Sequence, residues 1–253
     1  MLKTIRDSIL ILLFEFIGTT LLCCLYNVAL RHWDYCGFLM GTYVILILGA
    51  KISGSHYNPA ITVAFMFRKD VGRFSRVLGL AYIIFQFCGA FCGALLAFWF
   101  NGEVGFLGLP GNSASYIPAT IIAESLGTLL LTFLYLTQTE AKTKLSQDPA
   151  ITTLIIASTY FAAILMVGAT GNYGFGCLNP AIGMATCLVM SFGGQSEGMK
   201  WFWIYLAFPF LGAILGIIFH ELLYKNMQDS VEEVEDKDDG ILDKVAETHE
   251  DDE

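Results

Sequence analysis

Long apolar stretches alternate with short polar segments along the first 224 residues of the chain. A helix needs about 20 predominantly apolar residues to cross a hydrocarbon core about 30 Å thick. Six stretches are long enough, so we expect six membrane-spanning helices. They lie at about 9–30, 36–54, 75–98, 117–138, 150–168 and 202–224.

Two further apolar pieces, at about 59–67 and 180–191, follow the second and fifth long stretches. Ten helical residues, at about 1.5 Å each, reach only half-way across the hydrocarbon core. We therefore expect two re-entrant half-helices that enter the membrane without crossing it.

Each half-helix begins at the same Asn-Pro-Ala triplet. Asparagine is a favoured N-cap, and proline is favoured at the first helical position because its missing N–H is not needed there. Each triplet therefore predicts a helix that starts near the middle of the membrane. The triplets are Asn58-Pro59-Ala60 and Asn179-Pro180-Ala181.

The two halves of the chain resemble one another. An acid followed by Gly-Thr recurs in the first and fourth stretches, the triplet recurs after the second and fifth, and a Gly-xxx-Gly pair recurs in the third and sixth. A three-span unit that is repeated once must be inverted in the second copy, because it crosses the membrane an odd number of times. The repeated landmarks are Glu15 with Glu124, the two triplets, and Gly89/Gly93 with Gly212/Gly216.

Composition agrees with a membrane protein, since 55% of residues are hydrophobic and mean hydropathy is +0.61. The net charge of −9 comes from the end of the chain, where residues 229–253 contain 13 acidic and two basic residues. Such a segment cannot build an apolar core, so we expect 225–253 to be a disordered acidic tail. A role in docking a partner is the alternative.

Basic residues cluster in alternate connections, and this asymmetry predicts orientation. It places residues 1–8, the tail and two of the connections in the cytosol, across either the plasma membrane or an intracellular membrane. The clusters are Lys3 and Arg6; Arg68, Lys69, Arg73 and Arg76; and Lys142 and Lys144, against Arg31 and Lys200 on the other side.

The triplets have a chemical consequence if the two half-helices meet. A helix N-terminus carries about half a positive charge, so two of them that face one point oppose cations. The Asn58 and Asn179 amides would donate hydrogen bonds to a passing oxygen atom and interrupt a proton-conducting file. The intramembrane acids Glu15 and Glu124 are expected to hold the broken backbone, with a proton relay as the alternative.

The segment 52–64, ISGSHYNPAITVA, resembles the first signature of the major intrinsic proteins, which comprise aquaporins and aquaglyceroporins. Further matches are the two Glu-x-x-Gly-Thr motifs, Gln86-x-x-Gly89-Ala90, Trp203-x-Tyr205 and Pro209-x-x-Gly212-Ala213. The resemblance covers about 9–224, with repeats at about 9–98 and 117–224.

The resemblance implies an all-α membrane protein of the aquaporin type, with six transmembrane helices, two re-entrant half-helices and an inverted repeat. It also implies a pore in each protomer of a homotetramer. That pore would carry water and small neutral solutes such as glycerol, urea or ammonia.

The second signature departs from the family pattern, because Ile182 follows the triplet where nearly every member has an arginine. By distance from the triplets, the resemblance places the selectivity constriction at Phe38, Val167, Gly176 and Ile182, which predicts an apolar and comparatively wide filter. His56 is expected to line the pore, to respond to pH, or to serve in hydrogen-bonded packing.

Two other functions stay open at this point. One is a non-conducting structural or docking protein that uses the acidic tail, and the other is a coupled transporter that uses Glu15 or Glu124 as proton carriers. We expect no enzyme, because the sequence has no nucleophile with a base, no phosphate loop and no metal-ligand cluster. Neither a cofactor nor nucleic-acid binding is indicated.

Overall fold

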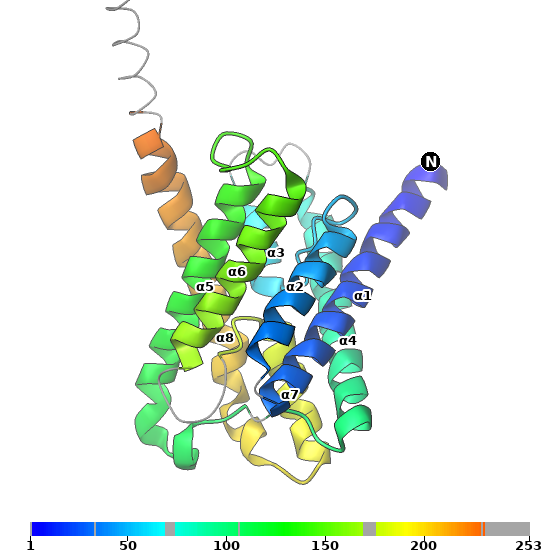
Figure 1. The fold of residues 1–253 in the computed structure, drawn as a ribbon, viewed down its shortest axis with the longest axis vertical. Coiled ribbons are helices and arrows are strands. Elements are labelled where there is room, and N and C mark those ends of the chain that lie inside the picture. Colours follow the sequence, from blue (N-terminus) through cyan, green and yellow to red (C-terminus); the bar gives the residue numbers. More distant parts are fainter. Residues whose placement is uncertain are drawn as a thin grey trace, which may run out of the picture.

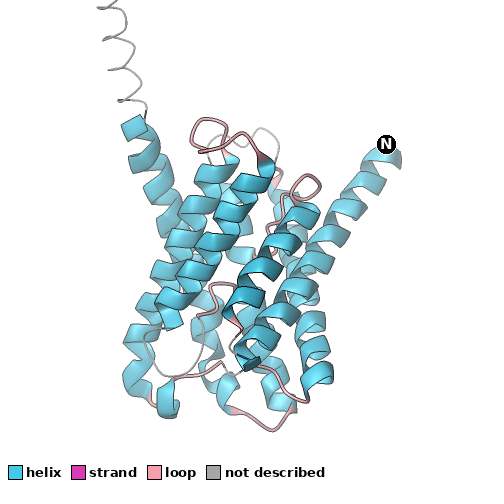
Figure 2. Cartoon of the chain, viewed as in Figure 1, coloured by secondary structure: helices cyan, strands magenta, loops and turns pink. Residues whose placement is uncertain are grey.

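The computed structural model describes residues 2–32, 34–68, 74–105, 107–168, 176–228 and 230. Within this part of the chain the regular structure is helical throughout and contains no strand (Figure 2). The main helices are α1 (Leu2–His32), α2 (Tyr35–Gly49), α3 (Pro59–Phe67), α4 (Arg76–Asn101), α5 (Ile117–Thr139), α6 (Pro149–Gly168), α7 (Pro180–Phe192) and α8 (Glu197–Ile218). Short 3₁₀ turns η1 (Pro110–Asn112) and η2 (Ala114–Tyr116) precede α5, and the π-helix η3 (Phe219–Tyr224) follows α8.

The predicted fold class is confirmed: α3 and α7 are the two short helices that begin at the triplets, and the other six form the bundle. Five of those six are long and apolar enough to cross a membrane, whereas α2 has only 15 residues. It ends at Gly49 rather than at the predicted residue 54. The N–H groups of Ile52, Ser53 and Gly54 all turn back to the Gly49 carbonyl, so the helix closes there.

The two halves of the chain have inverted directions in the bundle (Figure 1). One end of the bundle, which we call the terminal face, carries the start of α1, the 140–148 connection and η3; the opposite face carries the connections 102–116 and 193–196. Helix α3 lies in the half nearer the terminal face and α7 in the other half, with contacts between them. Each half-helix also packs against helices of the other repeat, α3 against α8 and α7 against α4.

Glycines allow the repeat-related pairs α1/α4 and α5/α8 to touch backbone to backbone. A Cβ atom on Gly89 would strike the Phe16 carbonyl oxygen, and one on Gly212 would strike the Ser125 carbonyl oxygen. Close approach of this kind packs helices in lipid, where apolar surface gains nothing by leaving the solvent. The glycine pattern read in the sequence therefore has the same structural cause in both halves.

Valine at either glycine is expected to separate the paired helices. Overpacking of a tight contact destabilises a protein by up to about 3 kcal/mol. Gly89→Val and Gly212→Val should therefore lower the yield of monodisperse protein in detergent by several-fold. The matched controls are Cys88→Val and Leu211→Val, at adjacent exposed positions. Equal yields for glycine and control variants would contradict the packing account.

The outward surfaces of the helices are apolar, as a lipid environment requires. Large hydrophobic side chains are exposed there, including Val44 at 63%, Val77 at 77% and Ile84 at 61%. The buried positions, by contrast, include many hydroxyl, amide and carboxyl groups. Large apolar side chains on the outward faces, together with polar groups in the interior, suit a bundle that is surrounded by lipid.

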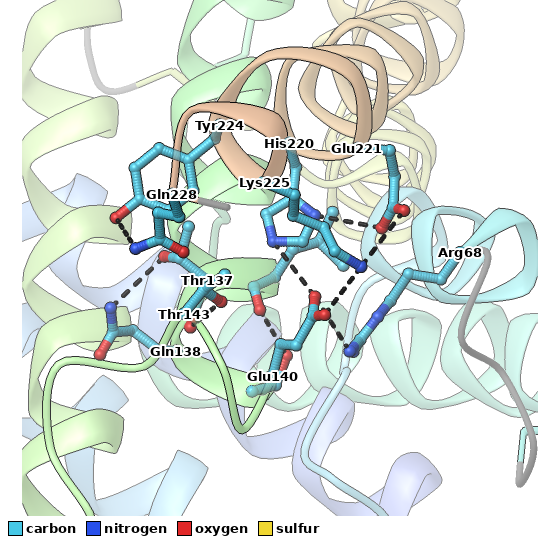
Figure 3. A network of polar contacts seen from close by, with 12 residues as sticks. Arg68, Thr137, Gln138, Glu140, Thr143, His220, Glu221, Tyr224, Lys225 and Gln228 are labelled. Atoms are coloured by element: carbon cyan, nitrogen blue, oxygen red, sulfur yellow. Dashed lines mark hydrogen bonds and ion pairs between the residues drawn. The ribbon is translucent and has the colours of Figure 1, made fainter. Parts of the chain in front are cut away.

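A network of charged side chains ties η3 to the bundle at the terminal face (Figure 3). Glu140, which caps α5, lies 2.8 Å from Lys225 Nζ and 3.3 Å from an Arg68 nitrogen. His220 lies between Glu140, 3.5 Å from Nε2, and Glu221, 3.2 Å from Nδ1. Arg68 ends α3, so this network links a half-helix to the last helix.

Potential ligand atoms of Glu140, His220 and Glu221 lie within 4.8 Å of one another, a proximity that their spacing in the sequence does not indicate. Arg68 and Lys225 bring positive charge to the same carboxylates. Their presence disfavours a divalent cation, and we interpret the network as an ion-pair cluster.

Beyond residue 224, where sequence analysis ends the last span, residues 225–228 continue as helix. The acidic segment 231–253 and the basic residues Lys69 and Arg73 lie outside the described residues.

Candidate functional site

The two triplets place two helix N-termini at the centre of the bundle. The Asn58 side-chain oxygen accepts a hydrogen bond from Ala60 N at 2.8 Å, and that of Asn179 accepts from Ala181 N at 3.1 Å and Ile182 N at 3.4 Å. Both asparagines have extended backbone angles, as N-caps do, and each is followed by proline in the first helical turn. The capping predicted for each triplet is present.

Each asparagine also reaches across to the other repeat. Asn58 Nδ2 donates to the Leu178 carbonyl at 2.9 Å, and Asn179 Nδ2 donates to the Tyr57 carbonyl at 2.9 Å. A carboxamide carries two N–H groups. One N–H of each asparagine is thus used in a reciprocal clasp, and the second is the one that could serve a passing molecule.

The backbone before each triplet is held by a buried carboxylate of its own repeat. Tyr57 and Leu178 have left-handed φ values of 46° and 55°, which is unusual for bulky residues. Glu15 accepts hydrogen bonds from the Tyr57 N–H at 2.8 Å and from the residue before it, and Glu124 accepts from the Leu178 N–H at 2.8 Å and likewise from its predecessor. Both carboxylates are fully buried, so they offset the strain of the two turns.

A small cavity lies where the half-helices meet. Its volume is about 20 Å³, enough for one water molecule. Both asparagine side chains line it, so polar donors face an otherwise largely apolar space. The other lining residues are Leu22, Leu46, His56, Ile61, Leu131, Tyr135, Ile156 and Tyr160. We call this space the midplane cavity.

A larger vestibule of about 240 Å³ adjoins the midplane cavity on the side of the terminal face. The two spaces share Leu46, Tyr135 and Ile156 as lining residues, so these three side chains form the neck between them. The rest of the vestibule wall is polar or small and includes Lys51, Gly54, Ser55, Gln138, Thr152 and Thr153.

On the other side of the midplane cavity, aromatic rings pack around Phe38. Its ring centroid lies 6.1 Å from that of Tyr26 and 5.7 Å from that of Tyr160, both in edge-to-face geometry. Tyr26 donates its hydroxyl to the Gly176 carbonyl at 3.0 Å. The Gly176 carbonyl thus already accepts a hydrogen bond from a phenol hydroxyl.

The other constriction residues predicted from the resemblance differ in how they are placed. Ile182 is fully buried in the first turn of α7. The Val167 side chain and residues 169–175 lie outside the described residues. Of the four predicted constriction residues, the structure therefore places three: Phe38, Gly176 and Ile182.

Comparison with known proteins identifies the family. A family model described as "Major intrinsic protein" matches residues 8–220. The chain belongs to the major intrinsic protein family. Because five of its helices are also long and apolar enough to cross a membrane, it is an integral membrane protein.

Plant aquaporins are among its relatives. A probable PIP-type aquaporin 7a of Pisum sativum is 28% identical over 76% of this chain and 65% of its own length. Aquaporin PIP1-5 of Zea mays is 29% identical over 76% of this chain and also 65% of its own length. The chain therefore spans about two thirds of the length of these relatives.

A solved structure shares the fold. The aquaglyceroporin from Plasmodium falciparum superposes with a TM-score of 0.71, covering 88% of this chain and 99% of that one, at 17% sequence identity. At this identity the likeness concerns the fold alone.

His56 combines two of the roles expected for it in this major intrinsic protein. It lines the midplane cavity, and it is nevertheless tightly packed, with its ring centroid 4.3 Å from that of Phe65. Its Nδ1 lies 3.2 Å from Thr62 Oγ1. The packing and the hydrogen bond fix the ring on the wall of the cavity.

Three tyrosines, Tyr26, Tyr135 and Tyr160, hydrogen-bond the loops before the triplets but do not stand out in the sequence. One signal could have found two of them: Tyr26 stands eleven residues after Glu15, and Tyr135 stands eleven residues after Glu124. A search for repeated side chains beyond the quoted motifs would have detected this pair. Tyr160 has no such signal in the pattern of repeats.

Proposed function

We propose that this protein is a passive membrane channel, rather than an enzyme, for water and small neutral solutes. The observation that carries the proposal is the midplane cavity, where Asn58 and Asn179 line a space of about one water molecule that adjoins a wider vestibule. The names of the relatives, aquaporins in two plants and an aquaglyceroporin in a parasite, support the same class of cargo.

Ion exclusion is assigned to the two half-helix N-termini. Each contributes about half a positive charge near the midplane, and among the described residues no carboxylate lines the midplane cavity. The second N–H of each asparagine orients a water oxygen and so interrupts a chain of proton transfers. With Ile182 in place of the usual arginine, these N-termini carry most of the barrier.

Glu15 and Glu124 are assigned a scaffold role rather than proton transport. Each accepts hydrogen bonds from two consecutive backbone N–H groups, and neither lines the midplane cavity or the vestibule. A proton carrier needs access to the solvent on both sides. Transport that requires a pH gradient would contradict this assignment.

The filter is proposed to lie at Phe38, Gly176 and Ile182, with Val167 as the fourth position. Ile182→Arg introduces a cation and a bulky donor there, so uptake of urea and glycerol is expected to fall at least fivefold relative to water. The control Ile182→Leu keeps the volume and should leave the ratio unchanged. Unaltered uptake of the larger solutes by the arginine variant would remove Ile182 from the filter.

Assembly and orientation complete the proposal: a homotetramer with both termini in the cytosol. The apolar outward faces of the helices support burial against lipid or a neighbouring protomer. The excess of Lys and Arg in the connections on the terminal face supports the orientation. Cross-linking of the purified protein in detergent tests the homotetramer. Protease access to the tail in sealed vesicles tests the orientation.

Osmotic shrinkage of proteoliposomes that contain the purified chain tests the channel itself. Water permeability at least tenfold above that of empty vesicles is expected, with an activation energy close to that of free diffusion. Rates equal to those of empty vesicles would favour the non-conducting docking protein. Deletion of residues 231–253 should leave the permeability of a channel unchanged.

A further inference from the structure

The inverted repeat carries a tyrosine at the same place in each half. Tyr26 follows Glu15 by eleven residues, and Tyr135 follows Glu124 by eleven. Both side chains are buried, with exposed fractions of 1% and 4%. Helices α1 and α5 therefore present equivalent phenols on the two sides of the midplane.

Each phenol donates its hydrogen bond to the loop that leads into the other repeat's half-helix. Tyr26 donates to the Gly176 carbonyl at 3.0 Å, and Tyr135 donates to the Ser55 and Gly54 carbonyls at 2.8 and 2.6 Å. Gly176 and Ser55 are each the third residue before the triplet asparagine. The same carbonyl of each loop is thus capped by the equivalent tyrosine.

Other side chains cap the neighbouring carbonyls. Tyr160 donates its hydroxyl to the Cys177 carbonyl at 3.2 Å. Each triplet asparagine donates a hydrogen bond to the carbonyl of the residue immediately before the other triplet. In the described parts of the two loops, five side-chain protons therefore serve six carbonyls, with Gly54 and Ser55 sharing the Tyr135 proton; the other four are those of Tyr57, Gly176, Cys177 and Leu178.

Tyr135 lines both spaces, whereas Tyr26 lines neither and reaches the midplane cavity only through the rings of Phe38 and Tyr160. Tyr135 forms part of the neck between the vestibule and the midplane cavity, and the Gly54 and Ser55 backbone lines the vestibule beside it. Tyr160 lines the midplane cavity from the other side, and the Phe38 ring connects it to Tyr26. A permeating molecule at the neck consequently meets the Tyr135 ring and carbonyl oxygens that already accept one hydrogen bond, which leaves them weaker acceptors than free carbonyls.

Free acceptors matter more to a polyol than to water. A polyol in a narrow pore loses the water bound to several hydroxyl groups at once, and each buried hydroxyl without an acceptor opposes entry. A site that lacks partners for a solute hydroxyl rejects that solute strongly. A water molecule in a single file can donate hydrogen bonds to the next water molecule and accept one from the asparagine amides.

We propose that Tyr26 and Tyr135 are paired selectivity residues that favour water over polyols by occupying the carbonyl acceptors of the pore. The proposal rests on the channel function proposed above. It concerns the constriction proposed around Gly176, because the Gly176 carbonyl accepts the Tyr26 hydroxyl.

The test compares four variants, three single and one double, in which Tyr→Phe removes the hydroxyl and keeps the ring. Tyr135→Phe and Tyr26→Phe free pore carbonyls, and the double variant frees both sides. Tyr82→Phe is the matched control, since Tyr82 donates to the Ser53 carbonyl at 2.9 Å, and neither residue belongs to the midplane cavity, the vestibule or the proposed constriction that includes Gly176. Glycerol and water permeabilities are measured on the same proteoliposomes.

The glycerol-to-water ratio is expected to rise about fivefold in each pore variant, the effect of one net hydrogen bond, and further in the double variant. The control should keep the wild-type ratio. Unchanged ratios in pore variants that still conduct water would overturn the proposal, and so would an equal rise in Tyr82→Phe, which would indicate general loosening of the loop. If neither the wild type nor any variant exceeds empty vesicles, the channel function itself fails and the proposal falls with it.

Discussion

Glu124→Ala is expected to destabilise the protein strongly. Glu124 accepts hydrogen bonds from Cys177 N and Leu178 N, both at 2.8 Å, in a fully buried setting. Alanine would leave two buried N–H groups unpaired at roughly 1–3 kcal/mol each. The left-handed turn at Leu178 would also lose the contacts that hold it.

Thermal unfolding of the purified protein in detergent measures this effect, and Tm should fall by at least about 5 °C. Glu124→Gln keeps one acceptor oxygen, so its Tm should lie between those of the wild type and the alanine variant. Glu197→Ala, at an exposed glutamate in the first turn of α8, is the control and should change little. A Glu124→Ala variant as stable as this control would contradict the scaffold role of the acid.

Asn179→Asp is expected to convert the neutral-solute channel into one that leaks cations. Aspartate is as good an N-cap as asparagine, so α7 should still begin at Pro180. The new carboxylate, however, adds a negative charge beside two helix N-termini that carry about half a positive charge each. The variant also loses the amide that donates to the Tyr57 carbonyl.

Sodium flux into proteoliposomes should rise at least tenfold over the wild type, while the water permeability persists. Asn179→Ser is the neutral control, because serine also caps a helix and adds no charge. Its sodium flux should stay at the wild-type level. A sodium-tight aspartate variant would show that the barrier to cations does not reside at the half-helix N-termini.

Much of the fold was predictable because the repeat and the lipid constraint act on local patterns. The length of apolar runs gives the long helices, and an Asn-Pro start gives the half-helices. The end of α2 was harder to predict, because it depends on backbone hydrogen bonds to Gly49 within a turn that no apolar pattern reveals.

The site was predictable where its chemistry is repeated in short motifs. Asn58, Asn179, Glu15 and Glu124 all stand at matching positions in the two halves. The capping tyrosines and the Glu140 cluster depend on contacts between distant segments, such as Tyr26 with Gly176, 150 residues apart. Individual tyrosines in apolar helices are ordinary packing residues, so only the three-dimensional contact distinguishes these.

The central claim is that solutes pass through the midplane cavity, and a matched pair of tryptophan variants tests it most directly. Leu131 lines the cavity and is 3% exposed, whereas Leu126 lies on the same helix with 49% of its side chain exposed on the outer surface. Stopped-flow shrinkage of proteoliposomes should show fast water flux for the wild type and Leu126→Trp and near-background flux for Leu131→Trp at equal protein content. Wild-type flux in Leu131→Trp would contradict the account.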